Sequence, residues 1–221
     1  VQLGQKLARS EKDLKTTILF SHYHLDHVSG LPSFLPLYND RAHITLAGPK
    51  LWQGGVKHVL NQLIAPPYFS RPLAKSPARL KYLDLSTKCF KIDDVKITPI
   101  LLNHPGNAFA YRFDFPGNRS FCFAPVSELD PACMQNNIIK WAKGADLFIH
   151  DAYFTDHEYS KNRGCGHSSI SKVLQVVKSA EVKKACLLHH TLGYNDSMFK
   201  KLAAKLPQNC AFAREGMKFS L

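Results

Sequence analysis

The chain consists of short apolar runs separated by longer stretches whose apolar residues have helical spacing. Short runs rich in β-branched and aromatic residues are typical of strands, whereas apolar positions three or four residues apart are typical of amphipathic helices. The mixture predicts an α/β or α+β fold. The predicted strands are residues 17–20, 43–46, 95–102, 109–115, 120–124, 147–149, 185–188 and 217–221, and the predicted helices are residues 50–64, 131–143, 168–180 and 196–206.

Polar residues mark the starts of the last two predicted helices. Ser168 or Ser169 stands before the apolar series of one, and Asp196 stands before that of the other. Side chains of this kind accept hydrogen bonds from the unpaired N–H groups at a helix start. The segment 65–69 contains two prolines, which end the helix before it and predict a loop beside a cleft.

The composition is that of one globular domain. Of the 221 residues, 45% are apolar, and no repeat, linker or low-complexity tract divides the chain, so we expect a single domain over residues 1–221. The formal charge of +12 favours anionic partners. Apolar runs stay far below the roughly 20 residues that cross a bilayer, which excludes a membrane-spanning protein. The six cysteines are scattered singly, which favours reduced thiols and a cytoplasmic location.

Histidines gather at the end of the first predicted strand. His22, His24, Asp26 and His27 fall within six residues. An extended chain would place His22 and His24 on one side, and a turn would bring Asp26 and His27 round. Imidazole and carboxylate ligands without nearby thiolates favour a catalytic metal site over a closed structural one. Surface histidines are the alternative, but four ligand-type residues rarely share this spacing by accident.

Three further predicted strands also end in histidines. His104 follows residues 100–102, the pair His150-Asp151 follows residues 147–149, and the pair His189-His190 follows residues 185–188. A lone histidine of this kind is more often a satisfied polar residue than a ligand. If the strands run in one direction in one sheet, however, their polar ends meet at one edge, where α/β sheets place their sites. The pattern therefore predicts a multi-histidine metal centre.

Residues 22–27 read H-x-H-x-D-H, which resembles the signature of metallo-β-lactamase-fold hydrolases. Residues 145–154, 164–169 and 187–189 resemble the ribonuclease Z branch of that superfamily, which cleaves phosphodiesters and not lactams. Residues 30–32 and 65–69 look more like those of its small bacterial-type phosphodiesterases than like those of transfer-RNA processing enzymes. The resemblance implies an αββα sandwich. It also implies strands before the signature that this chain lacks, so we expect a fragment, or a sheet edge that another chain covers.

The resemblance implies one or two divalent metal ions, with zinc favoured and manganese, iron or nickel accepted by the same ligands. The ions would polarise a phosphoryl oxygen and supply a metal-bound hydroxide as nucleophile. For the second ion, the resemblance favours His189 as a ligand over the adjacent His190. The implied ligands are His22, His24 and His104 for one ion and Asp26, His27 and His189 for the other.

Three residues carry catalytic roles by the same resemblance. His167 would protonate the departing oxygen, and Asp151 would fix the tautomer of His167 from behind. Asp26 would also orient the attacking water. His150 is expected in the core or behind the ligands.

One departure from the family pattern concerns the aspartate that bridges the two metals. Alignment of residues 121–128 with the corresponding strand puts Val126 at this position, and an isopropyl group cannot bind a metal. Glu128 or Asp130 would replace the bridge only if the loop bends. Without a bridging anion, two nearby cations repel each other, which weakens at least one site.

The leading functional hypothesis is a metal-dependent phosphodiesterase acting on a small nucleotide-type phosphodiester or on RNA. The alternative is a catalytically weakened or inactive relative that binds an anionic ligand or partner, because of Val126. Nucleic-acid binding through a basic surface alone lacks a supporting motif. The partners expected are thus an anionic phosphoester or RNA and no membrane, with a homodimer allowed.

Overall fold

A computed structural model describes residues 2–9, 13–50, 54–191 and 193–221. The chain divides into two compact units, residues Val1–Ser86 (unit 1) and residues Thr87–Leu221 (unit 2). Each unit has its own β-sheet and its own hydrophobic core. The single domain expected over residues 1–221 stays a prediction.

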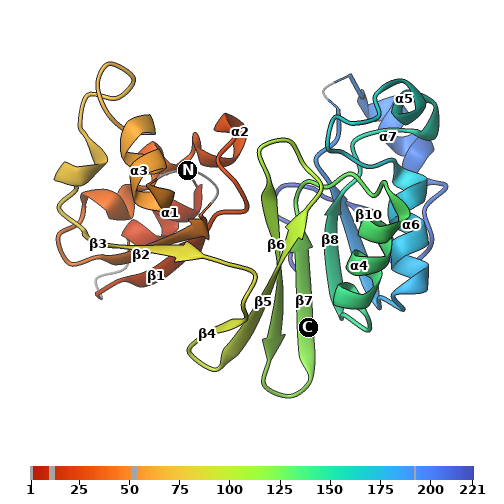
Figure 1. Ribbon diagram of the computed structural model, residues 1–221, viewed down its shortest axis with the longest axis horizontal. Coiled ribbons are helices and arrows are strands. Elements are labelled where there is room, and N and C mark those ends of the chain that lie inside the picture. Colours follow the sequence, from red (N-terminus) through yellow and green to blue (C-terminus); the bar gives the residue numbers. More distant parts are fainter. Residues whose placement is uncertain (1, 10–12, 51–53, 192) are drawn as a thin grey trace. The chain divides into compact units, whose positions relative to one another are not determined.

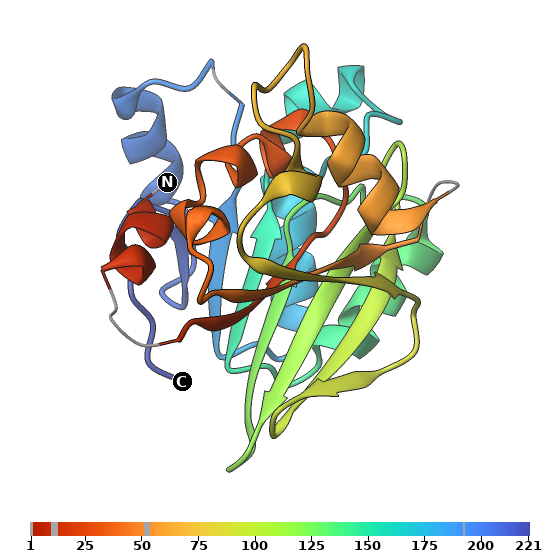
Figure 2. The ribbon, with the colours of Figure 1, turned by 90° about the vertical axis from the view of Figure 1, so that its left-hand side faces the viewer.

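Unit 1 contains a three-stranded parallel sheet with the order β1-β2-β3, and helix α3 packs along β2 and β3 (Figure 2). Its core includes Ile44 and Leu46 from β2 and Val56 and Leu60 from α3. The elements are α1 (Gln2–Ala8), β1 (Lys15–Leu19), α2 (Leu25–Val28), η1 (Leu31–Ser33), η2 (Leu35–Tyr38), β2 (His43–Pro49), α3 (Gly55–Leu63), η3 (Leu73–Lys75) and β3 (Arg79–Leu85).

Unit 2 contains a seven-stranded mixed sheet with the order β10-β9-β8-β7-β6-β5-β4, and helices α4 and α6 pack beside it (Figure 1). Ile138 of α4 and Val173 of α6 share a core with Cys122 and Phe148 of the sheet. The elements are β4 (Phe90–Ile92), β5 (Val95–Leu102), β6 (Ala108–Phe115), β7 (Arg119–Ala124), α4 (Ala132–Ala142), β8 (Leu147–Asp151), α5 (Asp156–Lys161), α6 (Ile170–Ser179), β9 (Lys184–Leu188), α7 (Asp196–Ala203) and β10 (Cys210–Phe212).

Strand direction in unit 2 brings chemically active residues to one edge. Strands β7, β8 and β9 are parallel, and β5 runs the same way because β6 lies antiparallel between β5 and β7. His104, Asp151 and His189 therefore stand at the same edge of this sheet, as the sequence predicts. The expectation of one shared sheet does not extend to residues 22–27, because β1 belongs to the sheet of unit 1.

The sequence misplaces several elements. Residues 217–221 form no strand, because a turn with Gly216 at φ 81° precedes them and the strand beside β9 is β10. The short strands β3, β4 and β10 and the helices α1, α2 and α5 are not predicted. The helix predicted over residues 50–64 begins at Gly55, and residues 51–53 lie outside the described residues.

Helix α7 ends at Ala203 instead of residue 206, and its capping residue is Asn195, whose side chain accepts a hydrogen bond from the Met198 N–H. Ser169 stands at the capping position of α6, as expected, but its side chain makes no capping hydrogen bond. Among the described residues, none of the helices is long and apolar enough to cross a membrane.

Candidate functional site

Unit 1 gathers three imidazole rings just beyond β1. The ring centroid of His22 lies 4.6 Å from that of His24 and 4.2 Å from that of His27. The Asp26 carboxylate lies 3.1 Å from His27 Nε2. Helix α2 begins directly after His24, so the chain turns between the second and third histidines. All four predicted ligands of unit 1 are thus close neighbours.

These four side chains differ in exposure. His22 is buried and its Nδ1 lies 3.0 Å from the Ser21 hydroxyl, whereas His24 and Asp26 are exposed. A buried ring beside exposed ligand-type groups can hold an ion at a surface that substrate reaches.

In unit 2, His104 contacts the glycine-rich turn formed by residues 164–166, which we call the 164–166 turn. His104 is buried, and its Nδ1 lies 3.0 Å from the Gly166 carbonyl oxygen. A carbonyl only accepts hydrogen bonds, so Nδ1 carries the proton and the lone pair lies on Nε2. This is the tautomer in which Nε2 can bind a metal.

His167 and Asp151 form a hydrogen-bonded pair at the same edge. His167 Nδ1 lies 3.1 Å from Asp151 Oδ2. The carboxylate is fully buried and also accepts hydrogen bonds from the backbone N–H groups of Ser127 and Ser168. Burial raises the pKa of Asp151 to about 7, while His150 and the N–H donors of Ser168 and Ser127 oppose the shift. The carboxyl of Asp151 therefore fixes the orientation of the His167 ring.

His189 lies beside His167 with the two rings stacked, 4.9 Å apart and 17° from parallel. Tyr153 stacks on His167 as well, at 4.8 Å. His189 adopts φ 57°, the left-handed region that a non-glycine residue rarely occupies. The rings of His104, His167 and His189 thus form one group, since His104 lies 5.1 Å from His167.

Two other histidines have structural surroundings. His150 is fully buried, burial lowers its pKa, and its Nδ1 lies 2.6 Å from the Asp151 carbonyl oxygen. His190 packs edge-on against Phe199 and Phe212 and contacts two backbone carbonyls. The burial of His150 agrees with its expected place in the core or behind the ligands, while the choice of His189 over His190 as a ligand stays a prediction.

The loop after β7 carries Val126 and two carboxylates, Glu128 and Asp130. Val126 is 1% exposed and packs in the core of unit 2. Glu128 accepts hydrogen bonds from the Tyr159 hydroxyl and from the 164–166 turn, and Asp130 pairs with Lys172. Both carboxylates are thus engaged by groups other than the proposed ligands, and whether either one could replace the bridge stays a prediction.

An open pocket of about 710 Å³ borders His104 within unit 2. Its lining places a cationic guanidinium and two prolines beside this histidine. The same lining includes the carboxylates of Glu128 and Asp130, so the guanidinium is not its only charge. The other lining residues are Asn103, Pro105, Glu128, Asp130, Pro131, Arg163, Gly164 and Gly166.

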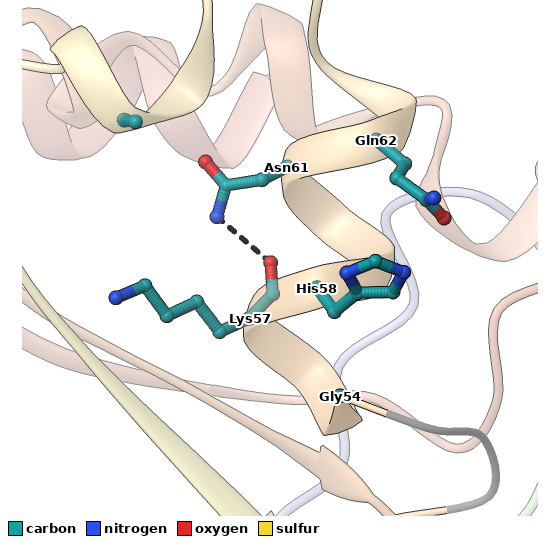
Figure 3. A pocket seen from close by; sticks show the side chains of 6 residues that line it. Gly54, Lys57, His58, Asn61 and Gln62 are labelled. Carbon is teal, nitrogen blue, oxygen red and sulfur yellow. Dashed lines mark hydrogen bonds between the residues drawn. The ribbon is translucent and has the colours of Figure 1, made fainter.

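A second hollow lies on α3 in unit 1 (Figure 3). Lys57 and Asn61 point to one side of the helix and His58 and Gln62 to the other, and Asn61 Nδ2 donates to the Lys57 carbonyl oxygen at 2.7 Å. Lys57 also lies over the ring of Tyr82. Among the described residues that line this hollow, His58 alone has a side chain of a common metal-ligand type, so the described lining forms no metal centre.

Sequence reasoning missed the roles of four residues in the site of unit 2. Tyr153, which stacks on His167, has no motif of its own beyond its place after Asp151. The backbone donors of Ser127 and Ser168 could be found only from the fold. Glu128 was considered as a metal ligand, whereas it holds the 164–166 turn.

Comparisons with known proteins place the chain in a family. The profile of the beta-lactamase superfamily domain matches residues 3–190, most of the chain. The ribonuclease Z of Lachnospira eligens is 24% identical in an alignment that covers 79% of this chain and 69% of that protein.

Two solved structures share the fold. The metallo-beta-lactamase fold protein YhfI of Bacillus subtilis superposes with a TM-score of 0.66 and 19% identity, covering 91% of this chain and 75% of that one. A diphosphatase from the PhnP family gives a TM-score of 0.69 and 16% identity, covering 96% and 73% of the two chains. The fold is thus of the metallo-β-lactamase type, as the sequence predicts.

Proposed function

Because the chain belongs to the beta-lactamase superfamily, we propose that it is a metal-dependent hydrolase that cleaves phosphodiesters of small nucleotides or of RNA. The observation that carries the proposal is the hydrogen-bonded pair of His167 and the buried Asp151 beside His104 and His189. An imidazole held by a carboxylate is suited to protonating a departing oxygen. The similarity to a ribonuclease Z and to a diphosphatase supports a phosphoester substrate.

The donor set fits divalent metal ions. Each proposed ligand offers one imidazole nitrogen or carboxylate oxygen, the donors that zinc, manganese and iron share. When bound, the ions would polarise a phosphoryl oxygen and lower the pKa of a water molecule. The proposed ligands are His22, His24 and His104 for one ion and Asp26, His27 and His189 for the other.

Other residues of the chain would donate a proton, orient the attacking water and attract the substrate. Asp151 accepts the Nδ1 proton of His167, so that Nε2 of the imidazolium is the atom that donates a proton to the departing oxygen. Asp26, exposed beside His27, orients the attacking water. Arg163, at the rim of the pocket beside His104, attracts the anionic substrate.

A second candidate function is binding of an anionic ligand by a catalytically weakened site. It is favoured by the burial of Val126 and by the engagement of Glu128 and Asp130 with other partners, which leave the expected bridge without a carboxylate. A single metal ion with slow chemistry would fit this candidate.

Two measurements test the proposal. Metal content per chain is measured by plasma mass spectrometry on protein purified without a histidine tag. Turnover of bis(p-nitrophenyl) phosphate and of a short RNA is then assayed with Zn²⁺ or Mn²⁺. Hydrolysis of either substrate supports the proposal, and His167→Ala should slow hydrolysis of the RNA, whose leaving group is poor, more than that of bis(p-nitrophenyl) phosphate. Metal-loaded protein without turnover of any phosphodiester contradicts it and favours the binding function.

A further inference from the structure

We propose that Glu128 is a positioning residue that fixes the ring of His104 through the 164–166 turn. The inference rests on the proposed function only in taking His104 as a metal ligand. It concerns how the fold prepares that ligand before any ion binds.

Glu128 holds the turn with both oxygens of its carboxylate. Its Oε1 accepts hydrogen bonds from the Gly164 N–H at 2.8 Å and the Tyr159 hydroxyl at 2.7 Å, and its Oε2 accepts one from the Gly166 N–H at 3.1 Å. The side chain is only 4% exposed. A buried carboxylate with three donors constrains them strongly, because losing one leaves a buried polar group unsatisfied.

The backbone of Glu128 is hydrogen-bonded to the chain at the end of β5, the strand that precedes His104. Its N–H donates to the Asn103 carbonyl oxygen at 2.8 Å. Asn103 in turn donates from its side-chain amide to the Asp130 carbonyl oxygen. Glu128 is therefore fixed relative to the end of β5 and holds the 164–166 turn against it.

The turn then contacts the His104 ring at Gly166. The Gly166 carbonyl accepts the Nδ1 proton of His104 at 3.0 Å. Gly166 adopts φ 87°, and a side chain there would collide with His104 Nδ1 and with Pro105. The turn thus lies directly against the ring, and a shift of the turn changes both the orientation and the tautomer of His104.

Asp130 provides a matched control. Its carboxylate accepts a hydrogen bond from the Tyr159 hydroxyl at 2.6 Å, as that of Glu128 does at 2.7 Å, and it forms an ion pair with Lys172. The described contacts of its side chain do not include the 164–166 turn. Replacing Asp130 therefore disturbs the shared tyrosine and leaves the hydrogen bonds to Gly164 and Gly166 in place.

The experiment compares wild type, Glu128→Gln and Asp130→Asn in the metal-free state at pH 8.5. Long-range ¹H–¹⁵N spectra of histidine-labelled protein report which nitrogen of His104 carries the proton, and competition with a chromophoric chelator gives the Zn²⁺ affinity. We expect wild type and Asp130→Asn to hold the Nδ1–H tautomer. In Glu128→Gln we expect a mixture of tautomers and a Zn²⁺ affinity about 10–100-fold lower.

Wild type alone already tests the inference, so a Glu128→Gln protein that fails to fold does not remove the test. An Nε2–H tautomer of His104 in the wild-type protein would overturn it. Unchanged tautomer and Zn²⁺ affinity in folded Glu128→Gln would overturn it too. A correct tautomer in a protein without phosphodiesterase activity would contradict the proposed function and leave the role of Glu128 intact.

Discussion

The two histidine clusters are built in different ways. In unit 1, residues 22–27 follow one strand, the rings of His24 and His27 lie next to that of His22, and the group that contacts His22 Nδ1 is its chain neighbour Ser21. In unit 2, the rings come from three separate loops, and groups outside the ligand set hold them, Gly166 for His104 and Asp151 for His167. Local sequence can thus specify a set of ligands, whereas proton placement requires partners from distant segments.

The largest effect expected distinguishes a proposed metal ligand, His22, from the proposed general acid, His167. His167→Ala should retain metal but lower kcat for substrates with poor leaving groups about 10²–10⁴-fold, the usual contribution of a general acid. His22→Ala should lose metal. Metal content and kcat for good and poor leaving groups are measured for both variants. Equal metal loss in the two variants would refute the division between the clusters.

The next effect tests the contact between turn and ring. Gly166→Ala should lower Zn²⁺ affinity about 10–100-fold, because its methyl group would displace His104. Gly164→Ala is the matched control, since Gly164 also has a positive φ, 84°, but a methyl group there meets nothing within 4 Å. Both variants place an alanine at a positive φ and so pay a similar backbone cost. A difference in Zn²⁺ affinity between them, measured by chelator competition, therefore reports the contact of the Gly166 methyl group with His104. Similar Zn²⁺ affinities in the two variants would show that the turn does not hold the ring.

A smaller effect concerns the buried carboxyl of unit 2. Because burial raises the pKa of Asp151 to about 7, the folded state binds a proton that the unfolded state releases near pH 4. The stability from this proton is fully present below pH 4 and is lost as the pH rises to 7. Relative to Asp151→Asn, wild type should lose about 2 kcal/mol of unfolding free energy between pH 5 and pH 8.

Urea unfolding at both pH values measures this change. Asp130→Asn serves as the control, because the ion pair with Lys172 lowers the pKa of Asp130 and keeps it ionised over this range. A pH-independent difference between wild type and Asp151→Asn would mean that Asp151 stays ionised in the folded protein.

The smallest effect expected comes from restoring the missing anion. Val126→Asp should raise the affinity for a second metal ion about tenfold, as one added opposite charge near a cation does. In the metal-free protein the same change should lower the melting temperature, because Val126 lies in the core. Metal content and thermal unfolding with and without Zn²⁺ are the measurements. An unchanged second-metal affinity would mean that position 126 does not face the ions.

The strands that carry the clusters are predictable because their apolar runs are continuous. Strand β5 occupies the predicted residues 95–102, and β8 and β9 lie within two residues of their predictions. By contrast, β10 has only three residues and depends on pairing with β9. Strand β3 alternates with exposed polar residues such as Arg79 and Lys81, so its sequence gives no apolar run.

The histidine motif reveals the ligand-type residues in the sequence. It does not reveal the residues that position them. The contact of His167 with Asp151 follows from a resemblance, and it is present. The hold of Glu128 on Gly166 joins residues 38 positions apart, and nothing local to either residue indicates it. Assignment of the metal ligands stays a prediction until metal content is measured.

The left-handed backbone of His189 implies a conflict between folding and chemistry. A histidine at φ 57° costs the folded state about 1 kcal/mol or more, whereas asparagine or glycine adopts this conformation more readily. A chain optimised for folding alone would replace it. His189→Asn should therefore give a more thermostable metal-free protein, as would Glu181→Gly at φ 54° after α6, but only the first should impair metal binding. Repeated selection for heat resistance without selection for activity would thus be expected to discard His189 early.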